Sequence, residues 1–452
     1  MNLEQTTTIT LSCDMSKEHS GPTMIHSTGV PNYQIHPMQI YILQDAFPND
    51  EIRNDSQGVL YNVPPANVIQ ALKDFGFSII STKTSGVRKV WVLSLEDISI
   101  NNLFISHSLT SPFFDIDGTR ISSDKVYKAE ALSKQLCKIV EESALSIDKS
   151  LFDAIKSEYM NYDNDPQIKR LLDLFLGIIE QYEGSNLDQL SAKSFFKSDN
   201  GFPECNLSLP NGFGTFIEKV VQHHQLPVEL NCIVTRIDTS SSDSIVRIYT
   251  KDERILLSKY ILITISIGCL KANSIEFIPS LPEWKQNAID IMGTGLANKI
   301  FLQFPFVFWD PTWPLIYSTS PRFRFFICRP NDCILQIKLA ARTAIEIEQK
   351  DDKETIDEVM ALLRTIFSDR DVPEPTKFLI TKWHQDEFSR GAYSNFAVNT
   401  DNQTLIDLAR ECNGRIHWAG EHTNHDGSIG CVDSAFESGQ REAKKIIQRI
   451  KL

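Results

Sequence analysis

The segment best suited to chemistry lies near the C-terminus, where a predicted strand, 416–419, runs into Gly420 and Glu421. A helix is predicted to begin near Asp433. At such a turn the backbone N–H groups can approach an anion, and the start of the helix adds the positive end of its dipole. This pattern predicts a phosphate-binding segment. A tight turn between strand and helix would also account for Gly420 and Glu421, so the residues alone leave both interpretations open.

Three side chains farther from this turn have types that are useful in a redox or amine-binding site. Lys299 follows a Gly-x-Gly turn at 293–295, and a lysine in that setting is usually only a solvated charge. Trp383 and Tyr393 would, on their own, be interpreted as aromatic core residues. The Gly-x-Gly sequences at 212–214 and 293–295 lack the third glycine of the dinucleotide-binding turn G-x-G-x-x-G. The residues alone therefore predict no complete dinucleotide site.

The elements that must position these residues follow from the spacing of apolar residues. Apolar spacing of three and four predicts helices, and short β-branched runs between turns predict strands. The predicted helices span 132–146, 148–160, 166–182, 353–367 and 439–451, and the predicted strands span 229–238, 244–251 and 260–268. The sequence therefore predicts a mixed α/β (α+β) fold.

Residues 1–97 are predicted to form a smaller α/β domain, followed by a larger domain at 98–452. Pro64 and Pro65 are typical of a helix start, because proline is tolerated where the first-turn N–H groups have no partner. A hairpin is predicted around Ser85-Gly86, since β-branched runs flank this turn. The predicted elements are strands at 9–15 and 59–63, a turn at 21–24, a helix at 66–75, and hairpin strands at 77–84 and 88–95.

Composition narrows the class of protein. The chain has 452 residues and a formal net charge of −13, which argues against a nucleic-acid partner and favours cationic ligands. Nine cysteines without a C-x-x-C pair predict free thiols in a reducing compartment, hence a cytoplasmic or nuclear protein. No secretory signal is recognised at the start, and the longest apolar stretch, 260–270, is too short to cross a bilayer. No metal site is predicted.

Four blocks, in order along the chain, resemble the flavin-dependent amine oxidases, and among them the polyamine oxidases. The blocks are ELNCIVTRID (229–238), YILITISIGCLKANSIEFIPSLPEWK (260–285), GTGLANKIFLQFPFVFWD (293–310) and RIHWAGEHTNHDGSIGCVDSAFESGQREAKKI (415–446). The resemblance runs from about Phe104 to the C-terminus. It implies a partial FAD-dependent amine oxidase fold, with an incomplete nucleotide-binding sheet and a substrate domain. It also implies an oxidoreductase that uses FAD and oxidises a polyamine or another amine.

The resemblance implies a role for each residue that could hold the cofactor. Val234 would meet the adenine end of FAD through its backbone. The backbone around Gly420 and Glu421 would meet a phosphate, through the N–H near Glu421. The N–H of Val432 would meet the pyrimidine edge of the flavin.

The same resemblance implies three residues at the reacting end of the cofactor. Lys299, in the block GTGLANKIFLQF, would hold a water molecule against the flavin N5 atom. Trp383 and Tyr393 lie in KWHQDEFSRGAYSNF (382–396), which resembles the family pattern W-x-x-D-x-F-x-x-G-x-Y-S. They would lie beside the flavin and the amine.

The chain departs from the family pattern at three places. The G-x-G-x-x-G turn that binds the pyrophosphate precedes the oxidase region in the family, and no such turn occurs here. We therefore expect deficient FAD binding. Ser434 replaces a glycine next to the flavin ring, where an added Cβ would crowd the cofactor. The family's substrate-side histidine aligns with Ser106, and His107 falls one place later.

Residues 1–97 resemble another family, the GTP cyclohydrolase feedback regulatory proteins. The resemblance rests on GPTM (21–24) and VIQALKDFGFSIISTKTSGVRKVWVL (68–93). It implies a pentameric ring that docks on GTP cyclohydrolase I and conveys inhibition by tetrahydrobiopterin and activation by phenylalanine. Val87 stands where the family has glutamine, which puts effector binding in question.

Three interpretations remain open at this point. In the first, the chain is a flavin amine oxidase that takes a hydride from a C–N bond and passes electrons to oxygen. In the second, it is a regulator that binds GTP cyclohydrolase I and carries a degenerate oxidase tail. In the third, two unrelated coding segments are joined. The first interpretation rests on the larger and more specific set of motifs.

Overall fold

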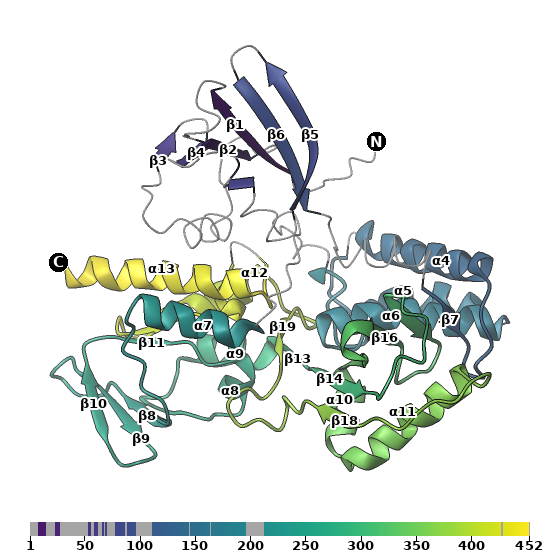
Figure 1. Cartoon of the computed structure of the whole chain (residues 1–452). Helices are drawn as coiled ribbons and strands as arrows, with labels where there is room; N and C mark the ends of the chain where they lie inside the picture. The colour runs from purple at the N-terminus through teal and green to yellow at the C-terminus, as the bar shows by residue number, and fades with distance from the viewer. Residues whose placement is uncertain are drawn as a thin grey trace. The chain divides into compact units, whose positions relative to one another are not determined.

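The computed structural model describes 8–14, 23–27, 53–55, 58–61, 66, 68–69, 77–85, 88–95, 111–143, 145–162, 164–195, 212–425 and 428–451. The chain divides into two compact units, Met1–Ile105 with Phe202–Gln225, and Ser106–Gly201 with Leu226–Leu452 (Figure 1). The boundary predicted between residues 97 and 98 stays a prediction. Among the described helices, none has the length and apolar character needed to cross a membrane.

The first unit contains an antiparallel sheet of six strands in the order β3-β4-β2-β1-β6-β5. The predicted hairpin is confirmed, because β5 and β6 pair from Ser85 opposite Arg88 to Phe77 opposite Leu95. The predicted turn at 21–24 is only partly correct, since a strand already begins at Thr23. The bounds are β1 Thr8–Asp14, β2 Thr23–Ser27, β3 Arg53–Asp55, β4 Gly58–Tyr61, β5 Phe77–Ser85 and β6 Arg88–Leu95, with α7 at Gly212–His223.

The second unit is built around a six-stranded sheet in the order β18-β14-β17-β16-β15-β7. Its strands are β7 Phe113–Phe114, β14 Ala297–Gln303, β15 Leu315–Ser318, β16 Phe325–Arg329, β17 Ile334–Ala340 and β18 Lys377–Ile380. One face packs on α10 (Ala341–Glu348) and α11 (Asp352–Ile366), with Ile300, Phe326 and Ile337 fully buried between them. The alternation of buried residues along β14 follows from this one-sided packing.

Three helices lie on the other side of this sheet: α4 (Ser123–Glu141), α5 (Leu151–Tyr159) and α6 (Pro166–Glu183) (Figure 1). The bounds of α6 are visible in the sequence. Asp165 caps its first turn by accepting the N–H of Ile168, and Gly184 ends it in the left-handed conformation at φ 66°. The predicted helix at 166–182 is therefore confirmed. A short 3₁₀ turn, η2, covers Met160–Tyr162.

The rest of the second unit contains the sequence blocks 229–238, 260–285 and 415–446. A four-stranded sheet, β10-β9-β8-β12, lies beside a parallel pair, β11-β20, and a common apolar core contains Ile237, Ile263 and Trp418. Another antiparallel pair joins β13 and β19. The strands are β8 Val234–Asp238, β9 Val246–Thr250, β10 Ile255–Ser258, β11 Ile261–Ile263, β12 Glu276–Ile278, β13 Gly293–Gly295, β19 Tyr393–Asn395 and β20 Ile416–Trp418. The helices are α8 Ile267–Lys271, α9 Glu283–Ile291, α12 Asn402–Ala409 and α13 Val432–Ile450, with 3₁₀ turns η4 Pro330–Asp332 and η5 Glu421–Thr423.

A fully buried lysine joins two of these helices. Lys285 of α9 donates to the carbonyl oxygens of Asp407 (2.6 Å) and Leu408 (2.7 Å) at the end of α12. Its ammonium lies 4.6 Å from the ring centre of Trp418. Burial lowers the pKa of Lys285 from 10.5 to about 7.

This burial predicts a pH-dependent stability. Below pH 7 Lys285 carries its charge in both states, so the desolvation cost is fully present in the folded chain. As the pH rises above 7, the folded state releases the proton before the unfolded state does, and the free energy of unfolding should rise by up to ~1.4 kcal/mol per pH unit. Urea unfolding at pH 7 and pH 9 should show this gain in the wild-type chain, and Lys285→Met should lack most of it. Equal pH slopes for the two proteins would contradict the assignment.

Candidate functional site

Lys299 lies in the middle of β14 and is exposed, between the buried Asn298 and Ile300. Its backbone N–H donates to the Thr381 hydroxyl at 2.8 Å, and its carbonyl accepts the N–H of Thr381 at 3.0 Å. The strand therefore holds Lys299 on the face opposite the α10–α11 core. The sheet therefore fixes the backbone position of Lys299.

Trp383 is anchored to the same strand through Asn298. The Asn298 side-chain oxygen accepts the Trp383 N–H and the Thr381 hydroxyl, both at 3.1 Å. The Asn298 amide donates to the buried Glu348 at 2.6 Å, and Glu348 also accepts the N–H of Gln385 at 2.9 Å. With its backbone fixed, Trp383 leaves 42% of its surface exposed. The Trp383 side chain is exposed, and the interpretation of Trp383 as a core residue is wrong.

Tyr393 begins β19, opposite Gly295 of β13. Its hydroxyl donates to the carbonyl of Tyr182 at 2.7 Å, and burial raises its pKa. A Cβ on Gly295 would lie 2.7 Å from the Glu183 carbonyl and 3.1 Å from the Tyr393 carbonyl, so only glycine allows the backbones to approach this closely. The first glycines of the block GTGLANK thus place Tyr393 near the start of β14.

Gly420 and Glu421 follow β20, as predicted. Gly420 has φ 129°, a conformation that favours glycine, and its N–H donates to the Ser438 hydroxyl at 2.8 Å. The Glu421 carboxylate accepts the N–H of Ser394 at 3.0 Å and the N–H of Gly430 at 2.6 Å. The Glu421 side chain therefore ties β19 to the loop before α13, a positioning role that sequence reasoning missed.

α13 begins at Val432, close to the predicted start at Asp433. Its N-cap residue, Cys431, makes no side-chain hydrogen bond to the first turn, and the Val432 side chain is 58% exposed. Ser434 is buried, and its hydroxyl donates to the carbonyl of Ser428. The Cβ that Ser434 adds at the glycine position of the family is therefore packed inside the protein.

Val234 occupies a different part of the site. It begins β8 and packs against the core that also contains Trp418 and Ile429. The Trp383 N–H bonds to Asn298, the residue before Lys299, and Tyr393 lies opposite Gly295, so the backbones of Trp383 and Tyr393 lie close to residues 295–299. The Glu421 carboxylate connects Ser394, which follows Tyr393, to Gly430 in the loop before α13. Among the described residues, Val234 makes no such connection and packs instead on the apolar core that contains Trp418. His107 lies outside the described residues.

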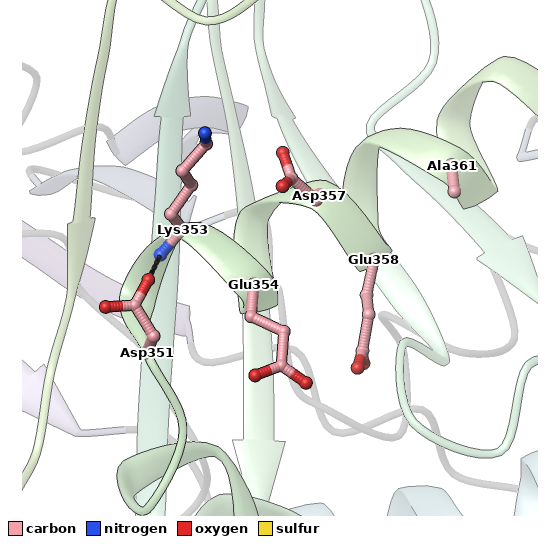
Figure 2. Close-up of a pocket in the computed structure, with 6 residues that line it drawn as sticks. All are labelled: Asp351, Lys353, Glu354, Asp357, Glu358 and Ala361. Carbon is pink, nitrogen blue, oxygen red and sulfur yellow. Dashed lines mark hydrogen bonds between the residues drawn. The ribbon is translucent and has the colours of Figure 1, made fainter.

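An open groove of about 640 Å³ runs along α11 (Figure 2). Figure 2 shows Glu354 and Glu358 on one side of the helix and Asp357 on the other, and the Asp351 carboxylate accepts the N–H of Lys353. None of the predicted site residues lines it. The groove is lined by Asp351, Lys353, Glu354, Asp357, Glu358 and Ala361. This acidic surface is separate from the candidate site.

A further residue missed at the sequence level is Asp115, which follows β7. Its buried carboxylate accepts two bonds from Arg170, at 2.7 and 2.6 Å, and the Thr319 hydroxyl at 2.6 Å. These bonds tie α6 to β7 and to the end of β15. Since Arg170 is 55 residues from Asp115, no local spacing could have predicted the pair.

The N-cap side chain of α13 makes no hydrogen bond to the first turn, Gly420 has φ 129°, and Lys299 and Trp383 are exposed. A helix start of this kind can accept an anionic group, so the chemistry of these residues is compatible with the flavin that the family uses. The sequence contains no G-x-G-x-x-G motif.

Comparison with known proteins gives consistent matches. Residues 127–447 match the family described as flavin containing amine oxidoreductase. The chain is 31% identical over 291 residues to Lysine-specific histone demethylase 2 of Homo sapiens, covering 61% of this chain and 35% of that protein. It is 28% identical over 364 residues to Polyamine oxidase 4 of Oryza sativa subsp. japonica, covering 77% and 72%. The chain spans about a third of the length of the first histone demethylase relatives.

A solved structure shows the same fold. A double mutant of putrescine oxidase, made as a structure-based redesign of cofactor binding, superposes with a TM-score of 0.59 at 14% identity. The superposition covers 91% of this chain and 96% of that chain. The mixed α/β fold predicted from the sequence is thereby confirmed.

Proposed function

Because the chain belongs to the flavin containing amine oxidoreductase family, we propose that it is an FAD-dependent oxidase of a polyamine or another amine. What supports the proposal is that the backbones of Trp383 and Tyr393 lie beside residues 295–299 and that the Glu421 carboxylate joins Ser394 to the loop before α13. The relatives named as polyamine oxidases and histone demethylases support an amine substrate.

Different residues of this chain would bind different parts of the cofactor. Bound FAD would supply hydride acceptance from a C–N bond and electron transfer to oxygen. The backbone at Gly420 and Glu421 would hold a phosphate, and the N–H of Val432 would hold the pyrimidine edge. The backbone of Val234 would meet the adenine end.

The side chains at the reacting end would orient the substrate and a water molecule. Trp383 offers an exposed aromatic wall, and Tyr393 is fixed through its hydroxyl to the end of α6. Lys299 would hold a water at the flavin N5 position. We propose that FAD is held weakly, since the chain has no G-x-G-x-x-G turn, and that turnover without added FAD is accordingly low or lost.

Peroxide release tests this function. Purified chain is incubated with excess FAD and, separately, with spermine, spermidine, putrescine or a histone peptide that carries methylated lysine. We expect hydrogen peroxide with at least one of these amines and none with Lys299→Met over the same period. Absence of peroxide, together with no bleaching of the flavin by any amine under anaerobic conditions, would contradict an oxidase.

For residues 1–97 we propose a regulatory role, in which the domain assembles into an oligomer and docks on GTP cyclohydrolase I in the cytoplasm or nucleus. The antiparallel sheet and its β5–β6 hairpin agree with the elements predicted in the segment that resembles the regulatory family. A small domain with one sheet gains stability by assembly, because it buries little apolar surface alone. Tetrahydrobiopterin would be the effector of such a complex.

Light scattering on the full chain, with and without GTP cyclohydrolase I, tests this second role. We expect an oligomer, pentameric in the simplest case, that co-elutes with the cyclohydrolase. A monomeric chain that elutes apart from the cyclohydrolase, with or without tetrahydrobiopterin, would contradict it.

A further inference from the structure

Lys299 has a second lysine directly beside it. In the antiparallel pairing of β14 and β17, Lys299 lies opposite Lys338. Directly opposed residues of an antiparallel pair project from the same face, with Cβ atoms about 5 Å apart. Like charges in this position destabilise a sheet, so the lysine pair lowers the stability of this part of the fold. Such a cost is expected where the residues serve a function.

The surroundings of Lys338 supply little compensating charge. Lys338 is half-buried in β17, between the buried Ile337 and Leu339, and the Gln181 amide of α6 donates to its backbone carbonyl at 3.0 Å. Within the part of the chain that the structure describes, Lys338 forms no ion pair. Glu183, at the end of α6, is the carboxylate that acts on it electrostatically.

These surroundings disfavour the charged form of Lys338. Desolvation is the largest cause, the charge of Lys299 adds to it, and Glu183 opposes both, so that the pKa of Lys338 falls from 10.5 to about 8. At pH 7 roughly one molecule in ten then carries a neutral amine there, against about one in three thousand for an ordinary lysine.

We propose that Lys338 is a nucleophilic amine that binds a small aldehyde or ketone as a Schiff base. A lysine that is desolvated next to another cationic group is the arrangement that activates an amine for this reaction. The lone pair of Nζ attacks the carbonyl carbon, a C–N bond forms, the amine protons move to oxygen, and water leaves as the C=N bond is completed. No oxidant or reductant is consumed. The site lies next to Lys299, where oxidation of an amine would generate a carbonyl compound.

Lys285 provides an internal control. Its pKa is also lowered, to about 7, but it is fully buried and its ammonium donates to two carbonyl oxygens. A low pKa without access should give no reaction. Lys134 and Lys138 of α4 give the opposite control, since their side chains are 59% and 68% exposed.

Reductive alkylation tests the proposal without any flavin, so its result is independent of the oxidase function. The full chain is treated briefly at pH 7 with acetaldehyde and sodium cyanoborohydride, and each lysine is quantified by mass spectrometry after digestion. We expect Lys338 to be alkylated at least about tenfold faster than Lys134 and Lys138. Lys285 should stay unmodified.

Two variants test whether the reactivity of Lys338 depends on Lys299 in particular or on any nearby surface charge. Lys299→Met should slow alkylation of Lys338 at least about threefold, because the neighbouring charge that disfavours protonation is removed. Lys377→Met, on the adjacent strand β18, should leave it unchanged. Alkylation of Lys338 no faster than that of Lys134, or a rate unaffected by Lys299→Met, would overturn the proposal.

Discussion

In Lys299→Met, reaction of the reduced, FAD-loaded chain with oxygen is expected to be at least about a hundredfold slower, while reduction by amine changes less than about tenfold. Lys299 is exposed on β14 and its backbone is fixed by Thr381, so methionine removes the amine without disturbing the strand. A water molecule held by that amine would lose its partner. Stopped-flow absorbance of the two half-reactions, at saturating FAD, measures both rates.

Lys377→Met is the matched control for this effect. Lys377 is exposed on the neighbouring strand β18, opposite Gln303 of β14, and has no proposed role. Both half-reactions should match those of the wild-type chain. If Lys299→Met slowed the two half-reactions equally, Lys299 would be reduced to a surface charge.

Replacement of Asp115 by asparagine should lower the free energy of unfolding by about 3 kcal/mol. The Asp115 carboxylate is almost fully buried and accepts two bonds from Arg170 and one from Thr319, so asparagine leaves the guanidinium without a charge partner. The estimate lies at the lower end for a buried pair, because the Arg170 side chain is 35% exposed. Urea unfolding followed by circular dichroism measures the difference.

An exposed pair and a pH series sharpen this test. Asp243→Asn breaks the solvent-exposed pair with Arg247 and should lower the free energy of unfolding far less than Asp115→Asn does. Arg170 holds the pKa of Asp115 well below its usual range. The ionised Asp115 carboxylate therefore contributes fully to the free energy of unfolding above about pH 4, and this contribution is lost as the pH falls further. The difference in the free energy of unfolding between wild type and Asp115→Asn should accordingly become smaller at pH 3. A constant gap, or equal effects of the two substitutions, would contradict this account.

Local signals in the sequence predicted many elements well. The cap at Asp165, the proline at 166 and the glycine at 184 set the ends of α6, and the predicted helix at 353–367 matches α11 within a residue. The strand predicted at 260–268 is too long, because Ser266 caps a helix that begins at Ile267. The helix predicted from Leu132 begins instead at Ser123, where polar residues hide the apolar spacing of Val126 and Ala129.

The motifs in the sequence predicted the candidate site residues, but they did not predict the residues that hold those residues in position. Glu348 holds the Trp383 loop through Asn298, over a separation of 50 residues, and the Glu421 carboxylate bonds to Ser394. Both depend on the three-dimensional fold, which apolar periodicity does not encode. The lysine pair on β14 and β17 likewise appears only once the register is known.

Flavin content tests the central claim most directly, namely that this chain keeps the ring end of a flavin site without the pyrophosphate turn. Purified chain is precipitated, and the FAD released is quantified by absorbance against protein. We predict far less than one FAD per chain, with retention increasing only when excess FAD is added. A yellow protein with one FAD per chain after extensive dialysis would contradict the claim.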